Sequence, residues 1–466
     1  MKVAVVGCIH GELDTIYQQL ADLEAHNGYK IDLLLICGDF QSIRNENDFK
    51  CISIPVKFRQ LGTFHQYYKG EKTAPVLTIF IGGNHEASNY LITLPYGGWV
   101  APNIYYMGYS NVVRYKGLRI GGISGIYNKY HRNYGHFERL PMTEDTKRSA
   151  YHTRHLEAYR FMSVQEPLDI FMSHDWPSNV VHYGNLDQLL RWKPFFAQDI
   201  QRGSLGSPML DSLFSHLKPS RWFAAHLHVR FEAYVRHDPE RETRFLALDK
   251  PLPRRKYLEI LDLNPTNNSE NNTEDDDGAV DNDDNLYYDK EWLAALRVTD
   301  EYLSIEEKPE KQVPELWVSP RLSLQDELVK VEEIFKGDYK IDKNFSPVEP
   351  VTLNGDSDPD RIRNFTNPQT VAFCEKLGIR DPMTLIVSLY NKPHNPAEIS
   401  LSDEDDEEQE VDDCQSNGVF VIDRKRDKTL VMEQNTCNTT EKLKQDNRED
   451  IETNSVKKLK TDDVNC

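Results

Sequence analysis

The stretch that decides the fold is 2–11, in which the apolar run KVAVV is followed at once by GCIHG. A run of this kind predicts a short strand, and two side chains that can ligate a metal, Cys8 and His10, follow its end. Ligand sites of α/β folds collect at the carboxyl ends of strands. The stretch therefore predicts an α/β sheet that carries its chemistry on one edge.

Four more short motifs repeat this arrangement along the chain, each within a residue or so of the end of an apolar run. The motifs are Gly38-Asp39, GNHE at 83–86, SHD at 173–175 and AHLH at 225–228, and the runs are 32–37, 76–81, 168–172 and 221–225. Alone, a Gly-Asp pair is usually a turn, and a single histidine is more often structural than a ligand. Five such motifs in order predict one shared metal site.

The remaining pattern of the first 262 residues is also α/β, so we predict one catalytic domain over 1–262. A helix is expected at 14–25 with Asp14 as its N-cap, and a hairpin is expected from 112–115 and 118–123.

Beyond residue 262 the composition changes. The segment 264–285 carries eight acidic residues and no basic one, which predicts a disordered acidic linker over 263–285. A smaller, mostly helical domain is expected over 286–392, and a disordered charged tail over 393–466. Inside the smaller domain we expect helices at 292–303, 324–335 and 368–377 and a strand at 385–389.

Charge follows the same division. The chain has 466 residues and a formal net charge of -20, but residues 1–262 hold 31 Lys and Arg against 27 Asp and Glu. Fourteen of the 15 histidines lie in the first 237 residues. The negative charge therefore belongs to the linker and tail and does not exclude a polyanionic substrate. No run reaches the roughly 18 apolar residues that span a bilayer, so no membrane is expected.

The segment 124–154 is rich in tyrosine, histidine and cations and is long for a simple connection. Aromatic rings stack on unpaired bases and cations contact phosphates, which is how single-stranded RNA is bound. The alternative is a surface insertion whose tyrosines are incidental. The candidate substrate-binding residues are Tyr127, Lys129, Tyr130, His131, Arg132, Tyr134, His136 and Arg139.

The five motifs resemble the ordered signature of the calcineurin-like metallophosphoesterases. That resemblance implies a two-sheet β-sandwich flanked by helices and two divalent metals bridged by an aspartate. His10 and His228 then match ligands of the first metal, Asp39 the bridging ligand, and Asn84, His174 and His226 ligands of the second. His85 matches the histidine that protonates the leaving oxygen, and Asp175 is expected to have a structural role.

Cys8 departs from the family pattern, which has aspartate at this position. A thiolate is a softer ligand than a carboxylate and favours zinc or iron over magnesium or calcium. The alternative is that a ligand has been lost and the first site is empty. We expect two divalent ions per chain, drawn from Fe²⁺, Zn²⁺ and Mn²⁺.

Longer strings around the motifs resemble one branch of this superfamily, the RNA lariat-debranching enzymes. They are GCIHGELD from Gly7, GDFQSIRN from Gly38, GGNHEASNYL from Gly82, SHDWP from Ser173 and AHLHVRFEA from Ala225. The resemblance covers about 1–250, aligns 124–154 with a lariat-recognition loop, and continues to about residue 390. It implies a metal-dependent phosphodiesterase that hydrolyses the 2′–5′ bond at the branch of excised intron lariats during pre-mRNA splicing and intron turnover.

The implied partners are branched RNA and spliceosome-associated proteins, and the chain is expected to act as a monomer. The clusters RKRDK at 424–428 and KKLK at 457–460 are candidate import signals, which favours the nucleus, with some enzyme also in the cytoplasm. Two alternatives stay open. One is another metallophosphoesterase, a protein phosphatase or nucleotide phosphodiesterase, and the other is a catalytically inactive RNA-binding scaffold.

Overall fold

The structure is a computed structural model that describes residues 1–263, 283–318, 321–348 and 364–390. Residues Met1–Pro396 form one compact unit. Most of the expected linker (264–282) and the expected tail from residue 391 lie outside the described residues. Among the helices that are described, none combines the length and the apolar character that crossing a membrane would require.

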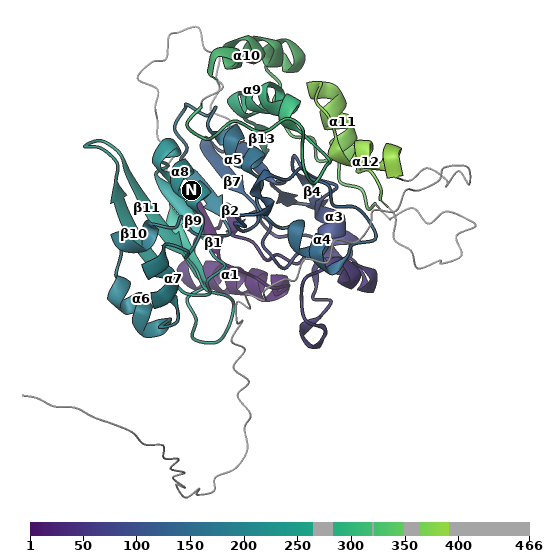
Figure 1. Cartoon of the computed structure of the whole chain (residues 1–466). Helices are drawn as coiled ribbons and strands as arrows, with labels where there is room; N and C mark the ends of the chain where they lie inside the picture. The colour runs from purple at the N-terminus through teal and green to yellow at the C-terminus, as the bar shows by residue number, and fades with distance from the viewer. Residues whose placement is uncertain (264–282, 319–320, 349–363, 391–466) are drawn as a thin grey trace, which may run out of the picture. The chain divides into compact units, whose positions relative to one another are not determined.

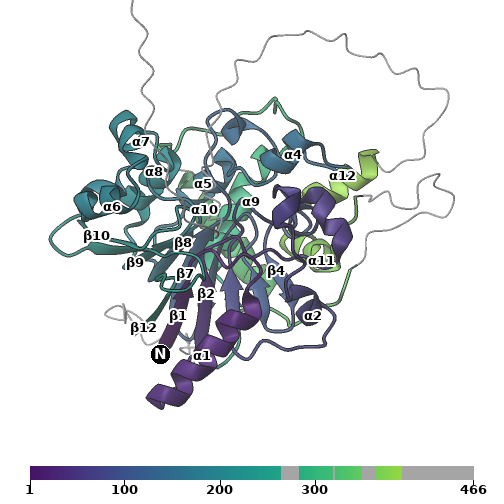
Figure 2. The ribbon, with the colours of Figure 1, turned by 90° about the horizontal axis from the view of Figure 1, so that it is seen from below.

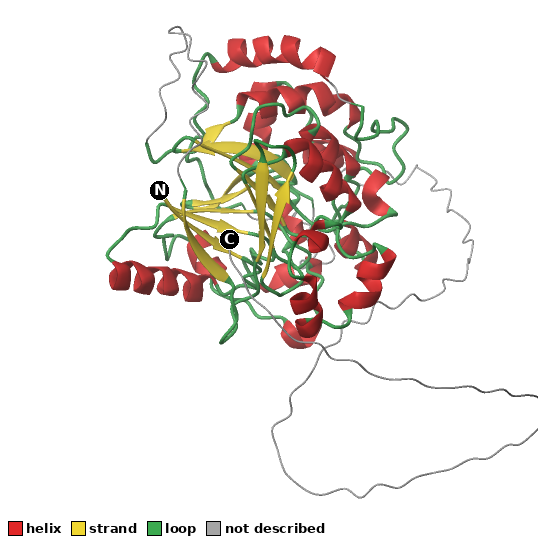
Figure 3. Cartoon of the chain, turned by 90° about the vertical axis from the view of Figure 1, so that its left-hand side faces the viewer, coloured by secondary structure: helices red, strands yellow, loops and turns green. Residues whose placement is uncertain are grey.

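Two sheets stack face to face (Figures 1 and 3). The first has the order β12-β1-β2-β3-β5-β4, with β1, β2, β3 and β5 parallel and both edge strands antiparallel. Its strands are β1 (Lys2–Val6), β2 (Leu33–Ile36), β3 (Leu77–Phe80), β4 (Gly98–Ala101), β5 (Ile104–Tyr106) and β12 (Leu258–Asp262).

The second sheet has seven strands in the order β10-β11-β9-β8-β7-β6-β13. Its parallel centre is β7, β8, β9 and β11. The strands are β6 (Ser110–Tyr115), β7 (Leu118–Ile123), β8 (Ile170–Ser173), β9 (Arg221–Ala224), β10 (Phe231–Arg236), β11 (Glu242–Ala247) and β13 (Tyr287–Tyr288).

The central strands are apolar throughout because both of their faces are covered. In β1, Val3 and Val5 point into the core between the sheets, whereas Ala4 and Val6 join the outer core beneath α1 (Leu13–Asn27). From the second sheet, residues such as Ile170 and Met172 meet the inner core. This arrangement confirms the predicted two-sheet sandwich flanked by helices.

Helices cover both outer faces of the sandwich (Figure 2). Short 3₁₀ turns lie at Glu46–Cys51, Val56–Phe58, His131–Asn133, Val180–Tyr183 and Asp300–Tyr302. The remaining helices are α2 (Phe64–Tyr68), α3 (Ser88–Leu91), α4 (Glu144–Ser149), α5 (His155–Phe161), α6 (Leu186–Trp192), α7 (Phe196–Arg202), α8 (Pro208–Leu217), α9 (Lys290–Thr299), α10 (Arg321–Phe335), α11 (Pro368–Leu377) and α12 (Pro382–Tyr390).

Two local predictions are wrong. The expected strand at 385–389 lies inside α12, whose start is capped by Asp381, because its carboxylate accepts the Met383 backbone N–H at 2.9 Å. Asp14 is not an N-cap, because α1 begins at Leu13 and the Asp14 carboxylate instead accepts the Tyr67 hydroxyl at 2.7 Å.

A buried ion cluster joins the residues after 286 to the second sheet. The Arg119 guanidinium of β7 donates to Asp289 and to Glu291 at the start of α9, in each case at 2.7 Å. Burial would raise the pKa of Asp289, but Arg119 outweighs it and holds that pKa well below its usual range. The neighbouring strand pair, β13 with β6, brings the same segment onto the sheet edge.

Arg119→Met should therefore lower the free energy of unfolding at pH 7 by about 3–5 kcal/mol, because it leaves buried carboxylates without their partner. The loss should shrink as the pH falls, since protonation removes the uncompensated charge. Denaturant unfolding at pH 5 and pH 7 measures both. Arg114→Met is the matched control, because Arg114 also contacts Asp289 but is half-exposed, and its loss should stay below about 1 kcal/mol. Equal losses in the two variants would contradict the cluster's role.

Candidate active site

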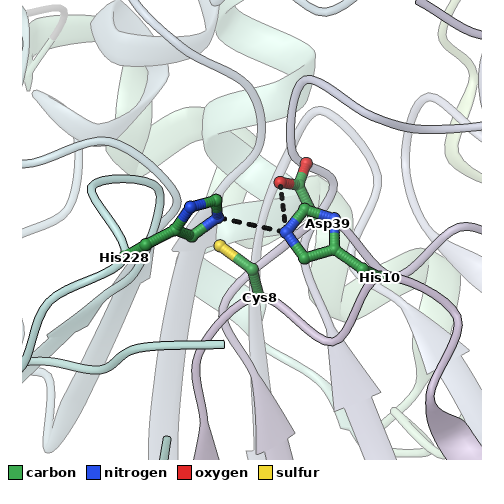
Figure 4. A group of neighbouring side chains, drawn as sticks. All are labelled: Cys8, His10, Asp39 and His228. Carbon is green, nitrogen blue, oxygen red and sulfur yellow. Dashed lines mark hydrogen bonds and ion pairs between the residues drawn. The ribbon is translucent and has the colours of Figure 1, made fainter. Parts of the chain in front are cut away.

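Five strand ends meet at one edge of the sandwich, and the segments that follow them carry the predicted ligands. In Figure 4, Cys8, His10, Asp39 and His228 converge from three different loops, and their ligand atoms all lie within 4.8 Å of one another. His10 Nε2 is 3.1 Å from His228 Nε2 and 3.7 Å from Asp39 Oδ2. Residues more than 200 positions apart thus form one donor group.

A second donor group shares Asp39. His174 Nε2 lies 3.5 Å from Asp39 Oδ1 and 3.2 Å from Asn84 Oδ1, and the rings of His174 and His226 are 5.0 Å apart. His174 Nδ1 donates to the Cys37 carbonyl at 2.7 Å, which directs Nε2 toward the group. The structure therefore brings all seven predicted ligands together, with one oxygen of Asp39 facing each group.

The protonation states of these side chains suit a cation. Burial lowers the pKa of His10 and of His226 to about 4, so both imidazoles are neutral near pH 7. Burial would raise the pKa of Asp39, but the imidazoles of His174, His85 and His10 outweigh it and hold that pKa well below its usual range. One carboxylate and several neutral imidazoles, with a thiol beside them, are the donors that divalent transition metals prefer.

Cys8 is buried in the first group and its sulfur accepts the His226 backbone N–H at 3.2 Å. Burial, followed by the nearby charge of Asp39, raises the pKa of this thiol well above its ordinary value. A coordinating metal ion deprotonates a thiol outright, since the cation replaces the proton. The position of Cys8 therefore fits a metal ligand. It does not support the alternative that a ligand has been lost and the first site is empty.

The backbone of the site is strained in a consistent way. His10, Asp39, His226 and His228 all have positive φ, between 47° and 58°. Such left-handed conformations cost non-glycine residues about 1–3 kcal/mol each and persist where the surrounding structure compensates. Each of these residues follows a strand within a few positions, so the left-handed turn redirects the chain where the donors gather.

His85 lies beside the two donor groups. Its backbone N–H donates to Asp39 Oδ1 at 2.9 Å, and its ring Nδ1 is 3.0 Å from the Ser53 carbonyl. The opposite ring nitrogen, Nε2, is 3.2 Å from the Asn84 amide nitrogen. The ring is therefore anchored at one end, and its other end is held next to the second donor group.

Comparisons with known proteins agree with this geometry. Residues 1–230 match the calcineurin-like phosphoesterase family, and residues 240–382 match the C-terminal domain of lariat debranching enzymes. The chain is 45% identical to lariat debranching enzyme A of Xenopus laevis over 432 residues, which cover 91% of this chain and 78% of that protein.

The similarity extends to distant organisms. The human lariat debranching enzyme is 46% identical, with 82% of this chain and 70% of that protein covered. The Arabidopsis thaliana lariat debranching enzyme is 40% identical, with 89% and 95% covered. The chain belongs to the lariat debranching enzyme family. It is thus a metal-dependent phosphodiesterase, and the family implies a divalent metal site at the donor groups described above.

A residue that the sequence interpretation left without a role completes this debranching-enzyme site. Glu86 is buried, and its carboxylate accepts the backbone N–H groups of Phe40 at 2.7 Å, Gln41 at 2.8 Å and Gly83 at 3.1 Å. Burial and the charge of Asp39 raise the pKa of Glu86 to about 8. Glu86 joins the loop after β2 to the loop after β3. Its position in the GNHE motif is the sequence signal that could have identified it.

The predicted lariat-recognition loop is only partly exposed. Lys129 lies over the Tyr130 ring at 4.6 Å, and both are exposed, whereas Tyr127 packs against the core. His131 stacks on Tyr134 at 5.0 Å, and Nδ1 of His131 is 2.8 Å from Nδ1 of His152.

Arg132 is half-buried, and the exposed Arg139 lies over the Tyr390 ring of α12 at 3.9 Å. Of the eight predicted substrate-binding residues, Lys129, Tyr130 and Arg139 are therefore the exposed ones.

The inner part of the loop is buried in spite of its polar side chains. His136 is buried, stacked on Tyr109 at 4.0 Å and 2.9 Å from a Glu157 oxygen, so its ring supports the loop from within. Glu138 and Arg154 form a buried ion pair. Charged and aromatic side chains can be buried when they are paired with one another, so the polar composition of the segment did not indicate that part of it is buried.

Two adjacent glycines give a test of this packing. A Cβ on Gly83 would lie less than 3.0 Å from Asp39 Oδ1 and from the His174 ring, whereas a Cβ on Gly82 would meet only ordinary contacts at 3.5–3.6 Å. Gly83→Ala should therefore lower the bound divalent metal per chain severalfold, and the matched control Gly82→Ala should retain it. Elemental analysis after reconstitution, with a thermal melt to check folding, measures this. Full metal occupancy in folded Gly83→Ala protein would contradict the arrangement.

Proposed function

We propose that this chain hydrolyses the 2′–5′ phosphodiester at the branch of excised intron lariats, leaving linear RNA with a 5′-phosphate and a free 2′-hydroxyl on the branch nucleotide. The observation that carries the proposal is the pair of donor groups sharing Asp39, in a chain that matches lariat debranching enzymes across both of its halves. The buried thiol of Cys8 in the first group favours this branch over other phosphoesterases.

The two groups would hold two divalent ions. Cys8, His10, Asp39 and His228 would ligate one, and Asp39, Asn84, His174 and His226 the other, with Fe²⁺, Zn²⁺ or Mn²⁺ as the expected metals. Bound ions of this kind lower the pKa of water and neutralise the charge on the scissile phosphate. The neutral imidazoles fill the ligand positions without cancelling the positive charge that attracts the substrate.

The protein's own residues orient the substrate and donate a proton to it. His85, anchored through Ser53, is placed to give a proton to the departing 2′-oxygen as the bond from that oxygen to phosphorus breaks. Water supplies the new oxygen on phosphorus, so the products are a 5′-phosphate and a 2′-hydroxyl. The exposed rings and cations around Tyr130 would stack on bases and contact phosphates next to the branch.

The cellular location, the oligomeric state and the protein partners are also proposals. We expect the enzyme in the nucleus, with some in the cytoplasm, acting as a monomer in contact with spliceosome-associated proteins. The candidate import signals at 424–428 and 457–460 lie outside the described residues.

The direct test compares three substrates with the metal-loaded enzyme. They are a synthetic branched RNA, a linear 3′–5′ RNA and an aryl phosphate. Selective loss of the branch is expected. Equal cleavage of linear RNA would refute the specificity, and turnover of the aryl phosphate alone would favour a general phosphatase. Binding of branched RNA without turnover, whichever metal is loaded, would favour a scaffold.

His85→Ala should lower kcat on branched RNA by about 10²–10⁴-fold, because general acid catalysis is worth that much, while the metal content stays at the wild-type level. His26→Ala is the matched control, since His26 lies exposed at the end of α1. Loss of metal together with activity would instead give His85 a structural role.

Cys8→Asp should shift the metal preference toward harder ions such as Mn²⁺, because a carboxylate replaces a thiolate. The measurement is branched-RNA cleavage by apoprotein reloaded with Fe²⁺, Zn²⁺ or Mn²⁺. Cys374→Ala removes a buried thiol outside the site and should leave the order of metals as in wild type. An unchanged order in Cys8→Asp would mean that Cys8 is not a ligand.

A further inference from the structure

A short segment with an exposed tip lies beside His85. The segment covers 53–62, reads SIPVKFRQLG, and carries two cations and no acid. Near its two ends, Ile54 and Leu61 pack against the buried cluster that contains Ala87. Because Ala87 directly follows the GNHE motif, the 53–62 segment is fixed to the same loop that carries His85.

Both ends of the 53–62 segment contact the active site. At its start, the Ser53 carbonyl oxygen lies 3.0 Å from His85 Nδ1. At its end, Gly62 packs on Gly11, the residue after His10, so that a Cβ on Gly62 would lie 3.1 Å from the Gly11 carbonyl oxygen. One end therefore lies beside the proposed proton donor, and the other lies beside a ligand of the first donor group.

Between these ends the chain forms a tight turn. The Phe58 backbone N–H donates to the Pro55 carbonyl at 2.9 Å. One residue further on, the Arg59 backbone N–H donates to the Val56 carbonyl at 3.1 Å. The Arg59 side chain folds back across the turn, and its Nε donates to the Ile54 carbonyl at 3.0 Å. These three hydrogen bonds give the tip a defined shape.

The tip of the turn presents a ring and a cation to solvent. Val56 and Phe58 are 76% and 48% exposed, and the Lys57 ammonium lies 4.9 Å from the centroid of the Phe58 ring. Lys57 forms no ion pair within the part of the chain that the structure describes. Four residues of chain span at most about 14 Å, so Lys57 cannot lie farther than that from Ser53. The exposed ring and cation are therefore at the rim of the site, next to His85.

We infer that the tip of the 53–62 segment binds the nucleotides next to the branch nucleotide, on the strand that leaves with the free 2′-hydroxyl. The inference rests on the proposed function. Since His85 would protonate the departing 2′-oxygen, the branch nucleotide and its 3′–5′ neighbours lie on the His85 side of the scissile phosphate. There, Phe58 offers a ring on which a base can stack, and Lys57 offers a charge for a phosphate, as in single-strand binding without sequence preference.

Two branched substrates separate the strands. The first keeps about four nucleotides on each 3′–5′ side of the branch nucleotide and a single nucleotide on the 2′ arm, and the second has no flanking nucleotides but a 2′ arm of about eight. Phe58→Ala should lower kcat/KM for the first about tenfold, since one stacked base contributes about that much, and leave the second at the wild-type value. An unchanged value for the first substrate would overturn the inference. So would an equal loss on both, because the ring would then act through His85 and not on the flanking strand.

Two matched controls accompany this variant. Val56→Ala removes an exposed aliphatic side chain from the same turn, which cannot stack on a base, and Trp317→Ala removes an 80% exposed ring from another part of the surface. Both should keep the wild-type kcat/KM on the two substrates, and thermal melts check that all variants fold. A loss in either control as large as that in Phe58→Ala would also overturn the inference, because the effect would not belong to the Phe58 ring.

A binding measurement separates this inference from the proposed function. Fluorescence anisotropy with the metal-loaded enzyme and a labelled linear RNA of about nine nucleotides should show a Kd about tenfold weaker in Phe58→Ala. In Lys57→Ala the slope of log Kd against log salt should become shallower by about 0.7, the value of one phosphate contact on a single strand. If the wild type cleaves neither branched substrate, the proposed function fails and this measurement alone decides whether the segment binds RNA. A wild-type Kd in Phe58→Ala would then refute it.

Discussion

The site depends on one buried carboxylate. Asp39 faces His10 with one oxygen and His174 with the other, so two donor groups, each with residues from both sheets, share this one carboxylate. The surrounding imidazoles keep this carboxylate ionised in spite of its burial. An amide or a single-oxygen donor at this position could not offer an anionic oxygen to both groups.

Several features exist to hold that geometry. Glu86 anchors the loop that carries Asp39 through three backbone N–H groups, and glycine at positions 38 and 83 lets the His174 ring approach. Left-handed backbone at four ligands adds strain that the packed sandwich must compensate. These conformations lower the stability of the fold but place the donor side chains around a common centre, as a site that binds cations requires.

Much of the fold could be predicted because the central strands are unbroken apolar runs. β1, β7 and α11 have the bounds expected from sequence. The expected strand at 385–389 was wrong, because a short apolar run does not distinguish a strand from a buried helix, and the Asp381 cap decided for helix. The edge strands β4 and β12 were not expected, because β4 has only four residues and β12 pairs with β1, which lies more than 250 positions away in the sequence.

The sequence by itself determined the chemistry. Strand ends followed by Cys8, Asp39, GNHE and the late histidines specify which donors are available, because residue type and local order are properties of the chain. Only the tertiary structure decided which donors lie together, that His136 supports the loop from within, and that Asp249 and Tyr257 lie against Gly7. Those relations join residues up to some 250 positions apart, and no local pattern can encode a contact that depends on the closing of two sheets.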